Sequence, residues 1–285
     1  MIADWDTNYV FVSDLLEQRH PQIFASLRTV VPLGIIAGTA DVWCRDYMPV
    51  QVNDKRFCQF VYQPDYLRGW EHLITPAERC RLAFMSDYQQ ASIILDGGNV
   101  VASRSKAILT DKVFWENKEY KERELRIRLA DALEADCLFI PWDEQDETGH
   151  ADGVVRFLSE DRVLMNDYSR VDPEYGHTVS AVLKEAGLEI EMLPMFEDER
   201  PRKRDGISSA VGIYVNYLRV GNIVILPAYD RPEDDLALEK VSEVLPNATV
   251  HQINCCRLAK EGGVLNCVSW TVKLEQEGLI LHANG

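Results

Sequence analysis

The sequence predicts an α/β fold in which five modules surround a central axis, as the blades of a propeller do. Each module has the order strand, strand, helix, strand. Two observations lead to this prediction: an apolar pattern recurs about every fifty to sixty residues, and short polar motifs occupy corresponding places in the recurring unit. We therefore expect the 285 residues to form one domain, residues 1–285, whose last module closes across the termini.

Three consecutive segments follow this plan clearly. In each of them the apolar period changes from two, typical of a strand, to 3.6, typical of a helix, and back again. The expected elements are 99–102, 106–110, 118–133 and 137–140; then 153–157, 162–165, 174–186 and 188–192; then 213–217, 222–226, 233–245 and 248–251. Pro246 and Asn247 should end the last of these helices.

A fourth module is less regular, and the fifth combines the two ends of the chain. The less regular one has strands expected at 43–52, 57–62 and 92–95 and a helix at 75–88. A strand, a helix and a strand near the N-terminus, with a strand pair at 264–273 and 279–282, would complete the ring. The simpler alternative is an ordinary mixed α/β domain without a shared central site.

The composition indicates a globular protein with an acidic surface. Hydrophobic residues make up 46% and charged residues 27% of the chain, enough to bury a large core. The net charge of −16 argues against a nucleic-acid partner, because phosphate binding needs an excess of Lys and Arg on one face. A small cationic ligand fits this charge, although an acidic balance usually reflects only a solvated surface.

The cysteines and the N-terminus indicate a cytoplasmic location. Seven cysteines without regular spacing lie mostly in apolar runs, where reduced thiols pack as small hydrophobic groups. The N-terminal residues are acidic where a secretory signal is basic, and no apolar run reaches the roughly 18 residues of a membrane span. We expect no membrane partner.

Four polar motifs lie at corresponding positions of the modules: 43–46, 96–99, 149–152 and 262–267. Asp46 and Asp96 are 50 residues apart, Asp96 and His150 are 54 apart, and His150 and Cys267 are 117 apart, about two further modules. In a ring of modules these residues would meet at the central axis.

The set of motifs resembles the guanidine-modifying superfamily, the five-bladed α/β propellers called penteins. It is most similar to the agmatine deiminase and bacterial peptidylarginine deiminase branch, from about residue 40 to the C-terminus. That branch has a Trp-x-Arg-Asp strand, an acid-Gly-Gly turn, an Asp-Glu-Thr…Gly-His-x-Asp segment and a glycine-rich turn that ends in the nucleophilic cysteine. The resemblance implies a cysteine-dependent guanidine iminohydrolase that needs neither a metal ion nor another cofactor.

The resemblance also implies a role for each residue. Cys267 would be the nucleophile and His150 the acid and base, with Asp96 orienting the histidine. A guanidinium group is a planar cation that carboxylates match best, and Asp46 and Asp152 would hold it. The remaining expected substrate contacts are Trp43 and Arg45. Taken singly, each residue has a structural interpretation: a surface histidine, a packed thiol, a local Arg45–Asp46 ion pair or a plain turn at Asp96.

Two departures from the branch pattern concern the site itself. Asp96 stands where the branch usually has a longer Glu, so its carboxylate has to reach further to touch the histidine. Residues 47–49 are Tyr-Met-Pro in place of Thr-Gly-Pro, which changes the pocket wall. The chain is also shorter than typical agmatine deiminases. The pair Cys255 and Cys256 and the basic run 200–204 have no counterpart among the four motifs.

Several functions remain open at this level. Besides an agmatine deiminase, the sequence fits a peptidylarginine deiminase, an amidinotransferase of the same fold, or a non-catalytic pentein that only binds guanidinium groups. A papain-like thiol hydrolase fits poorly, because its cysteine lies early in the mature chain. Exposed module edges and the habits of the superfamily suggest a homodimer.

Overall fold

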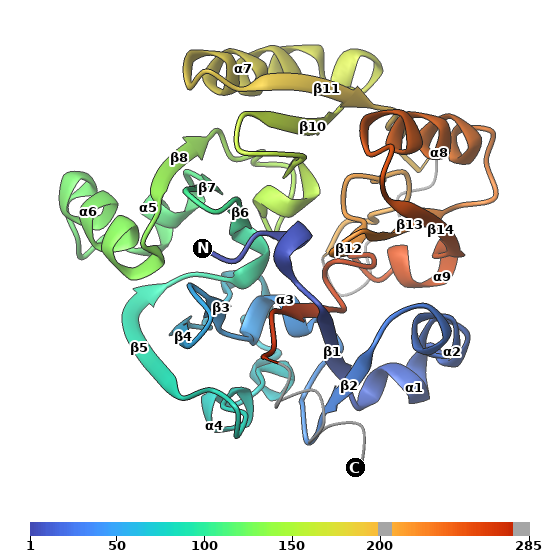
Figure 1. Cartoon of the computed structure of the whole chain (residues 1–285). Coiled ribbons are helices and arrows are strands. Elements are labelled where there is room, and N and C mark those ends of the chain that lie inside the picture. Colours follow the sequence, from blue (N-terminus) through green and yellow to red (C-terminus); the bar gives the residue numbers. More distant parts are fainter. Residues whose placement is uncertain (199–206, 276–285) are drawn as a thin grey trace.

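The computed structural model describes residues 1–198 and 207–275, and these residues form five three-stranded sheets around a common centre (Figure 1). Every sheet has the same plan, in which the first strand is antiparallel to the middle strand and the middle strand is parallel to the third. The sheets are β15 Trp270–Val272 with β1 Tyr9–Ser13 and β2 Leu33–Ile36; β3 Val50–Gln51, β4 Arg56–Val61 and β5 Asp87–Ile94; β6 Val101–Ala102, β7 Lys106–Thr110 and β8 Asp136–Ile140; β9 Val155–Phe157, β10 Arg162–Asn166 and β11 Glu189–Leu193; and β12 Leu218–Val220, β13 Ile223–Ala228 and β14 Thr249–Asn254. The prediction of an α/β protein built from small mixed sheets is confirmed.

Helices connect the parallel middle and third strands, which cannot be joined by a tight turn. These helices are α1 Leu15–Arg19, α2 Pro21–Val30, α4 Ala77–Cys80, α5 Lys112–Glu116, α6 Glu122–Leu133, α7 Pro173–Glu185 and α8 Glu233–Val244. The short helices α3 Cys44–Tyr47 and α9 Cys256–Ala259 instead lie between one sheet and the next. Helices α2, α6, α7 and α8 lie at the periphery, whereas the N-terminus lies near the centre (Figure 1). In α6, Leu125, Leu129 and Leu133 form one buried stripe at the helical spacing, which explains why this segment packs as a helix.

The two ends of the described chain share one sheet. Tyr9 in β1 pairs with Val272 in β15, and β1 also pairs with β2. The pairing of β1 with β15 agrees with the prediction that this module closes across the termini. The second strand expected near the C-terminus, at 279–282, lies outside the described residues. No helix in the described ranges has the length and apolar character needed to cross a bilayer.

Four predicted elements are wrong or displaced. Within the strand expected at 43–52, Cys44–Tyr47 form α3 and only Val50–Gln51 form a strand, β3. Residues 75–88 form only the short α4, and Asp87 already begins β5. Phe84 stacks on Phe11, with 5.6 Å between the ring centroids. This apolar residue therefore packs in the core and does not belong to a helix. In the module predicted at 213–251, the first strand is β12 and not 213–217. The predicted helix 118–133 begins only at Glu122, because Asn117 ends α5 by bonding its side-chain amide to both backbone groups of Ile94.

Candidate active site

One side chain from each sheet reaches the centre from the segment just before the first strand. Each of these residues lies two to four positions ahead of its strand; they are Asp46, Asn99, Asp152, Asn216 and Cys267. The segments touch one another: α3 contacts the short helix η4 Gly97–Asn99, and η4 contacts η5 Ala151–Gly153. A repeated local structure therefore brings distant parts of the chain to one place.

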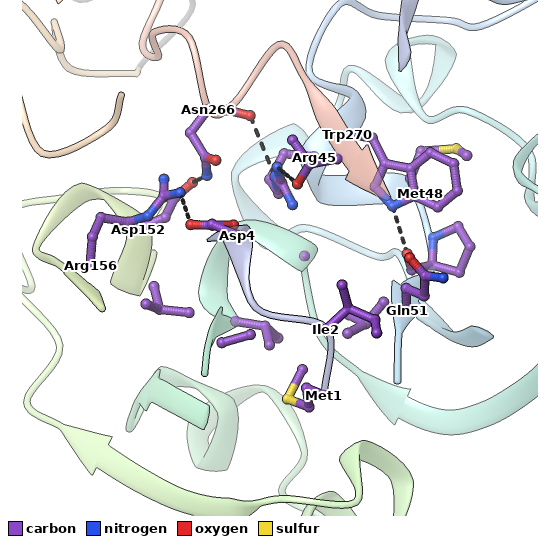
Figure 2. Close-up of a pocket in the computed structure, with 17 residues that line it drawn as sticks. Met1, Ile2, Asp4, Arg45, Met48, Gln51, Asp152, Arg156, Asn266 and Trp270 are labelled. Carbon is purple, nitrogen blue, oxygen red and sulfur yellow. Dashed lines mark hydrogen bonds and ion pairs between the residues drawn. The ribbon is translucent and has the colours of Figure 1, made fainter. Parts of the chain in front are cut away.

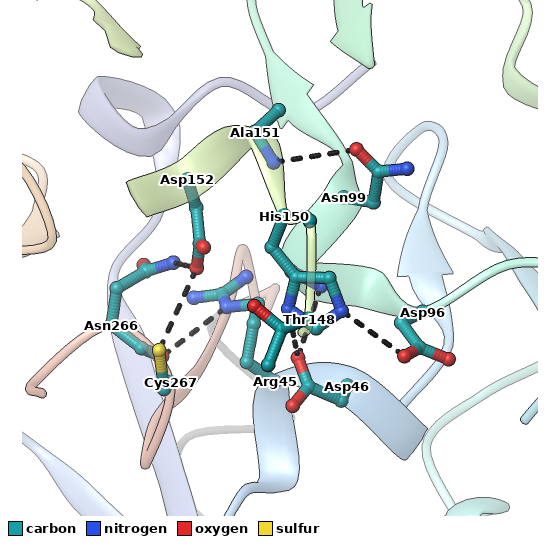
Figure 3. A network of polar contacts seen from close by, with 12 residues as sticks. Arg45, Asp46, Asp96, Asn99, Thr148, His150, Ala151, Asp152, Asn266 and Cys267 are labelled. Carbon is teal, nitrogen blue, oxygen red and sulfur yellow. Dashed lines mark hydrogen bonds and ion pairs between the residues drawn. The ribbon is translucent and has the colours of Figure 1, made fainter. Parts of the chain in front are cut away.

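His150 lies between two carboxylates (Figure 3). Its Nε2 is 3.0 Å from Asp96 Oδ2, and its Nδ1 is 3.5 Å from Asp46 Oδ1. Gly98 makes this approach possible, because a Cβ at that position would lie 2.5 Å from His150 Nδ1 and 2.6 Å from Asp46 Oδ1. The backbone N–H of Gly98 also donates to Asp46 Oδ1 at 3.2 Å. The acid-Gly-Gly motif thus supplies both a carboxylate and the space for the imidazole.

The shorter side chain of Asp96 does reach the histidine. Its Oδ2 also accepts a hydrogen bond from the hydroxyl of Tyr66 at 2.8 Å, and the rings of Tyr66 and His150 meet edge to face. Tyr66 belongs to the short helix η2 Asp65–Leu67, which follows β4. Asp96 is therefore fixed between a tyrosine and the imidazole.

Cys267 lies beside Asp152 and Asn216. Its Sγ is 3.2 Å from Asn216 Oδ1, to which the thiol can donate, and 4.0 Å from Asp152 Oδ2. Asn266 Nδ2 donates to the same Asp152 oxygen at 2.6 Å, which fixes the carboxylate (Figure 3). The thiol and the Asp152 carboxylate therefore adjoin one space.

That space is a cavity of about 730 Å³. Trp43, Asp46, His150, Asp152 and Cys267 all line it. Its further acidic lining residues are Asp143, Glu144, Asp146, Glu147, Asp172, Glu197, Asp198 and Glu261. Within residues 1–198 and 207–275, no Lys or Arg side chain lines it. The basic run 200–204 lies outside the described residues.

Arg45 does not lie where the sequence suggested. Its side chain lines a second, smaller cavity of about 50 Å³, together with Asp4 and Arg156 (Figure 2). Arg45 donates from Nε to the carbonyl oxygen of Asn266 at 3.4 Å and from its backbone N–H to that of Cys267 at 3.1 Å. Arg45 was expected to contact the substrate, but its side chain does not line the cavity that Cys267 lines, and it contacts the backbone of the Cys267 turn.

The carboxylates determine the protonation of the site. Burial by itself would lower the pKa of His150, but Asp46, Asp96 and Asp152 raise it to about 10. Burial, followed by Asp152 and Asp46, raises the pKa of the Cys267 thiol well above its usual range. Burial likewise raises the pKa of Asp46 to about 8, although the neighbouring His150 opposes this rise. At neutral pH the free site therefore holds an imidazolium and a neutral thiol.

This protonation state predicts how the free protein reacts with neutral alkylating agents. Only the thiolate reacts, so labelling of Cys267 by iodoacetamide should increase about tenfold per pH unit from about pH 6 to 9, without levelling off. Mass spectrometry of the Cys267 peptide at timed intervals measures this rate. A plateau below about pH 7 would show that a thiolate already exists in the free site, contrary to the pKa direction.

Three neighbours of the site were missed from the sequence: Asn216, Asn266 and Tyr66. Asn266 stands directly before Cys267 within one of the motifs, so its place in the module indicated the site. Asn216 occupies the place in its module that Asp46 and Asp152 occupy in theirs, but it lies in an apolar run that predicted a strand. Tyr66 lies in the short helix η2 and carried no sequence signal.

Comparisons with known proteins agree with this arrangement. The chain is 23% identical over 294 aligned residues to the "Putative agmatine deiminase" of Shewanella frigidimarina, covering 87% of this chain and 79% of that protein. The structure is similar to that of the agmatine deiminase of Enterococcus faecalis, with a TM-score of 0.80 at 15% identity over 95% of this chain and 94% of that one. It is also similar to a substrate-bound agmatine deiminase of C. jejuni, with a TM-score of 0.77 at 14% identity over 96% of both chains.

The family model of the Porphyromonas-type peptidyl-arginine deiminases matches residues 2–272. That match covers the whole sheet that joins the two ends of the described chain, including β1 and β15, as well as all four polar motifs. The resemblance inferred from the motifs is therefore confirmed, and the chain belongs to the Porphyromonas-type peptidyl-arginine deiminase family.

Proposed function

We propose that the protein is a cysteine-dependent deiminase that hydrolyses a guanidinium group to a ureido product and ammonia. The observation that carries the proposal is the convergence of Cys267, His150, Asp46 and Asp152 on one cavity. We further propose that residues 1–285 form one catalytic domain in which the five sheets are the blades of a closed propeller.

Asp46 and Asp152 would bind the guanidinium. A planar cation with N–H donors in a fixed fork is matched by carboxylates on its edges. Asp152 adjoins the Cys267 thiol and Asp46 adjoins His150, so a cation held by both places its central carbon between sulfur and imidazole. Its positive charge also offsets the two carboxylates that raise the pKa of the thiol, which favours the thiolate when substrate is bound. Trp43 lines the cavity and contributes its wall.

The reaction then divides into two steps. The thiolate of Cys267 forms a C–S bond to the guanidinium carbon, His150 gives its proton to the departing nitrogen, and the C–N bond breaks to release ammonia. The neutral His150 then takes a proton from water, whose oxygen attacks the thiouronium carbon. The C–S bond breaks, the ureido product leaves, and one proton passes to solvent. In both steps Asp96 holds the imidazole in place.

The acidic cavity favours a substrate with a second positive charge. A guanidine with an amine at its far end, such as agmatine, places that ammonium among carboxylates. Free arginine would instead bring its own carboxylate toward them, which like charge opposes. An arginyl residue within a peptide carries no carboxylate on its α-carbon and is the second candidate, because the family is described by that activity.

Turnover of matched substrates tests this proposal. Agmatine, arginine and an arginyl peptide are each incubated with the protein, and ammonia and ureido product are measured. We expect kcat/KM to be highest for agmatine, and N-acetylation of its amine to lower kcat/KM on the order of tenfold or more because one ionic contact is lost. Binding without turnover of any of them would instead support the non-catalytic guanidinium-binding alternative. Product formation that requires an added amine would support amidino transfer.

A further inference from the structure

Lys112 is a buried cation next to the candidate active site. Its side chain is 1% exposed, and it stands at the start of α5 in a module that provides no nucleophile or histidine. Its ammonium donates to the carbonyl oxygens of Glu147 at 2.9 Å and Thr148 at 2.8 Å and pairs with Asp65 Oδ1 at 2.9 Å. A buried ammonium is costly unless it is fully paired, so these contacts fix its position.

The contacts of Lys112 lead to His150 by two routes. In the first, the ammonium lies 5.2 Å from the centroid of the Tyr66 ring and pairs with the adjacent Asp65. The hydroxyl of Tyr66 donates to Asp96 Oδ2, which in turn contacts His150 Nε2. Any movement of Tyr66 would therefore displace the carboxylate that orients the imidazole.

The second route runs through the backbone. Thr148 stands two residues before His150, and its carbonyl oxygen is held by Lys112. The next carbonyl, that of Gly149, accepts from Thr110 Oγ1 at 2.6 Å. Gly149 has φ +62°, and a Cβ there would lie 2.8 Å from Lys112 Cδ, so the chain passes directly over the lysine side chain. The segment that carries His150 is thus hydrogen-bonded to Lys112 two residues before the imidazole.

We propose that Lys112 is a positioning residue for His150, because one buried ammonium fixes both the Asp65–Tyr66 segment and the Glu147–Thr148 segment around the imidazole. Lys112 does not touch the cavity, so it would act on the proton transfers without binding substrate. The kinetic part of this inference rests on the proposed deiminase function, and the spectroscopic part below does not.

The first test replaces Lys112 by methionine, which keeps most of the volume and removes the donors. We expect kcat for agmatine to fall on the order of 10²-fold, as misplacement of a catalytic group does, with KM changed by less than about threefold. Labelling of Cys267 by a cationic alkylating amidine should stay near the wild-type rate. The matched control is Lys118→Met, which removes an exposed lysine that lies over Trp115, and it should leave all three quantities unchanged.

A double-mutant cycle identifies the route. If Lys112 acts through Asp96, the effect of Lys112→Met on kcat should be much smaller in an Asp96→Asn background than in the wild type. Equal effects in both backgrounds, together with a joint loss of turnover and amidine labelling, would indicate a general structural role and overturn the proposal. Unchanged kcat in Lys112→Met would overturn it as well.

Proton NMR tests the inference without turnover. An imidazole N–H bonded to a buried carboxylate is protected from solvent exchange, so the wild type should show a slowly exchanging downfield ring proton for His150. We expect that resonance to be lost or broadened in Lys112→Met and retained in Lys118→Met. The wild type could lack deiminase activity while the resonance is still present in it and lost only in Lys112→Met. In that case the proposed function fails and the positioning role of Lys112 stands. A resonance that is the same in all three proteins overturns the role of Lys112.

Discussion

Replacing Cys267 by alanine is expected to abolish formation of ammonia and ureido product, a loss on the order of 10⁴-fold or more. The thiolate is the only group that can form the covalent intermediate, because no other cysteine lines the cavity in the described part of the chain, which includes all seven. The loss should appear in kcat, measured by ammonia release under saturating agmatine.

Binding should survive this substitution. The carboxylates of Asp46 and Asp152 remain, so calorimetry should give a dissociation constant for agmatine close to the wild-type KM. Cys256→Ala is the matched control, since Cys256 is half-buried near Asp230, outside the cavity, and its removal should leave kcat unchanged. A Cys267→Ala protein that keeps more than about a tenth of wild-type kcat would show that the reaction does not proceed through this sulfur.

The parts of the site that could be predicted are those that the module repeat encodes. The spacing of Asp46, Asp96, His150 and Cys267 indicated that they face one axis, and the structure places them around one cavity or in direct contact with its lining. Such a prediction works because each residue stands just before the first strand of its sheet. A local rule, repeated along the chain, thereby determines a tertiary arrangement.

Side-chain direction could not be predicted in the same way. Arg45 and Asp46 are neighbours in the single turn of α3, yet they line different cavities. In one helical turn, successive side chains point about 100° apart, so adjacent polar residues can face different cavities. A motif shows that such a pair is near the site, but only the packed structure shows which member faces the substrate.

Two other wrong predictions, at 213–217 and 75–88, concern apolar residues that pack into the core. The run 213–217 is apolar because Tyr214 and Tyr217 are buried in the core, and this run hid Asn216 within an apparent strand. Tyr214 is held there by a 2.6 Å hydrogen bond from its hydroxyl to Asp234 in α8. In the same way, the apolar residues Phe84 and Met85 made residues 75–88 resemble a helix. In the structure both residues pack into a core cluster outside any helix. Short apolar stretches do not distinguish core packing from a helix or a strand.

Replacing His150 by glutamine is the substitution with the second largest expected effect. Without a group to protonate the departing nitrogen and later to deprotonate water, kcat should fall on the order of 10² to 10⁴-fold. KM should change little, because the cation is held by Asp46 and Asp152. The matched control is His177→Gln on the exposed face of α7, which should keep wild-type kinetics. A large rise in KM with unchanged kcat would make His150 a binding residue and not the acid and base.

The same variant separates the electrostatic role of His150 from its chemical one. The carboxylates raise its pKa to about 10 in the folded protein, against about 6.5 for an unperturbed histidine. A raised pKa stabilises the folded state fully below the unfolded value, and this stabilisation is lost as pH rises toward the folded value. The unfolding free energy of the wild type relative to His150→Gln should therefore be greatest below about pH 6.5 and decrease steadily toward about pH 10.

Denaturant titrations of both proteins at several pH values measure this difference in unfolding free energy. A constant difference across that range would show that His150 is neutral in the free site, and it could not then protonate the leaving nitrogen.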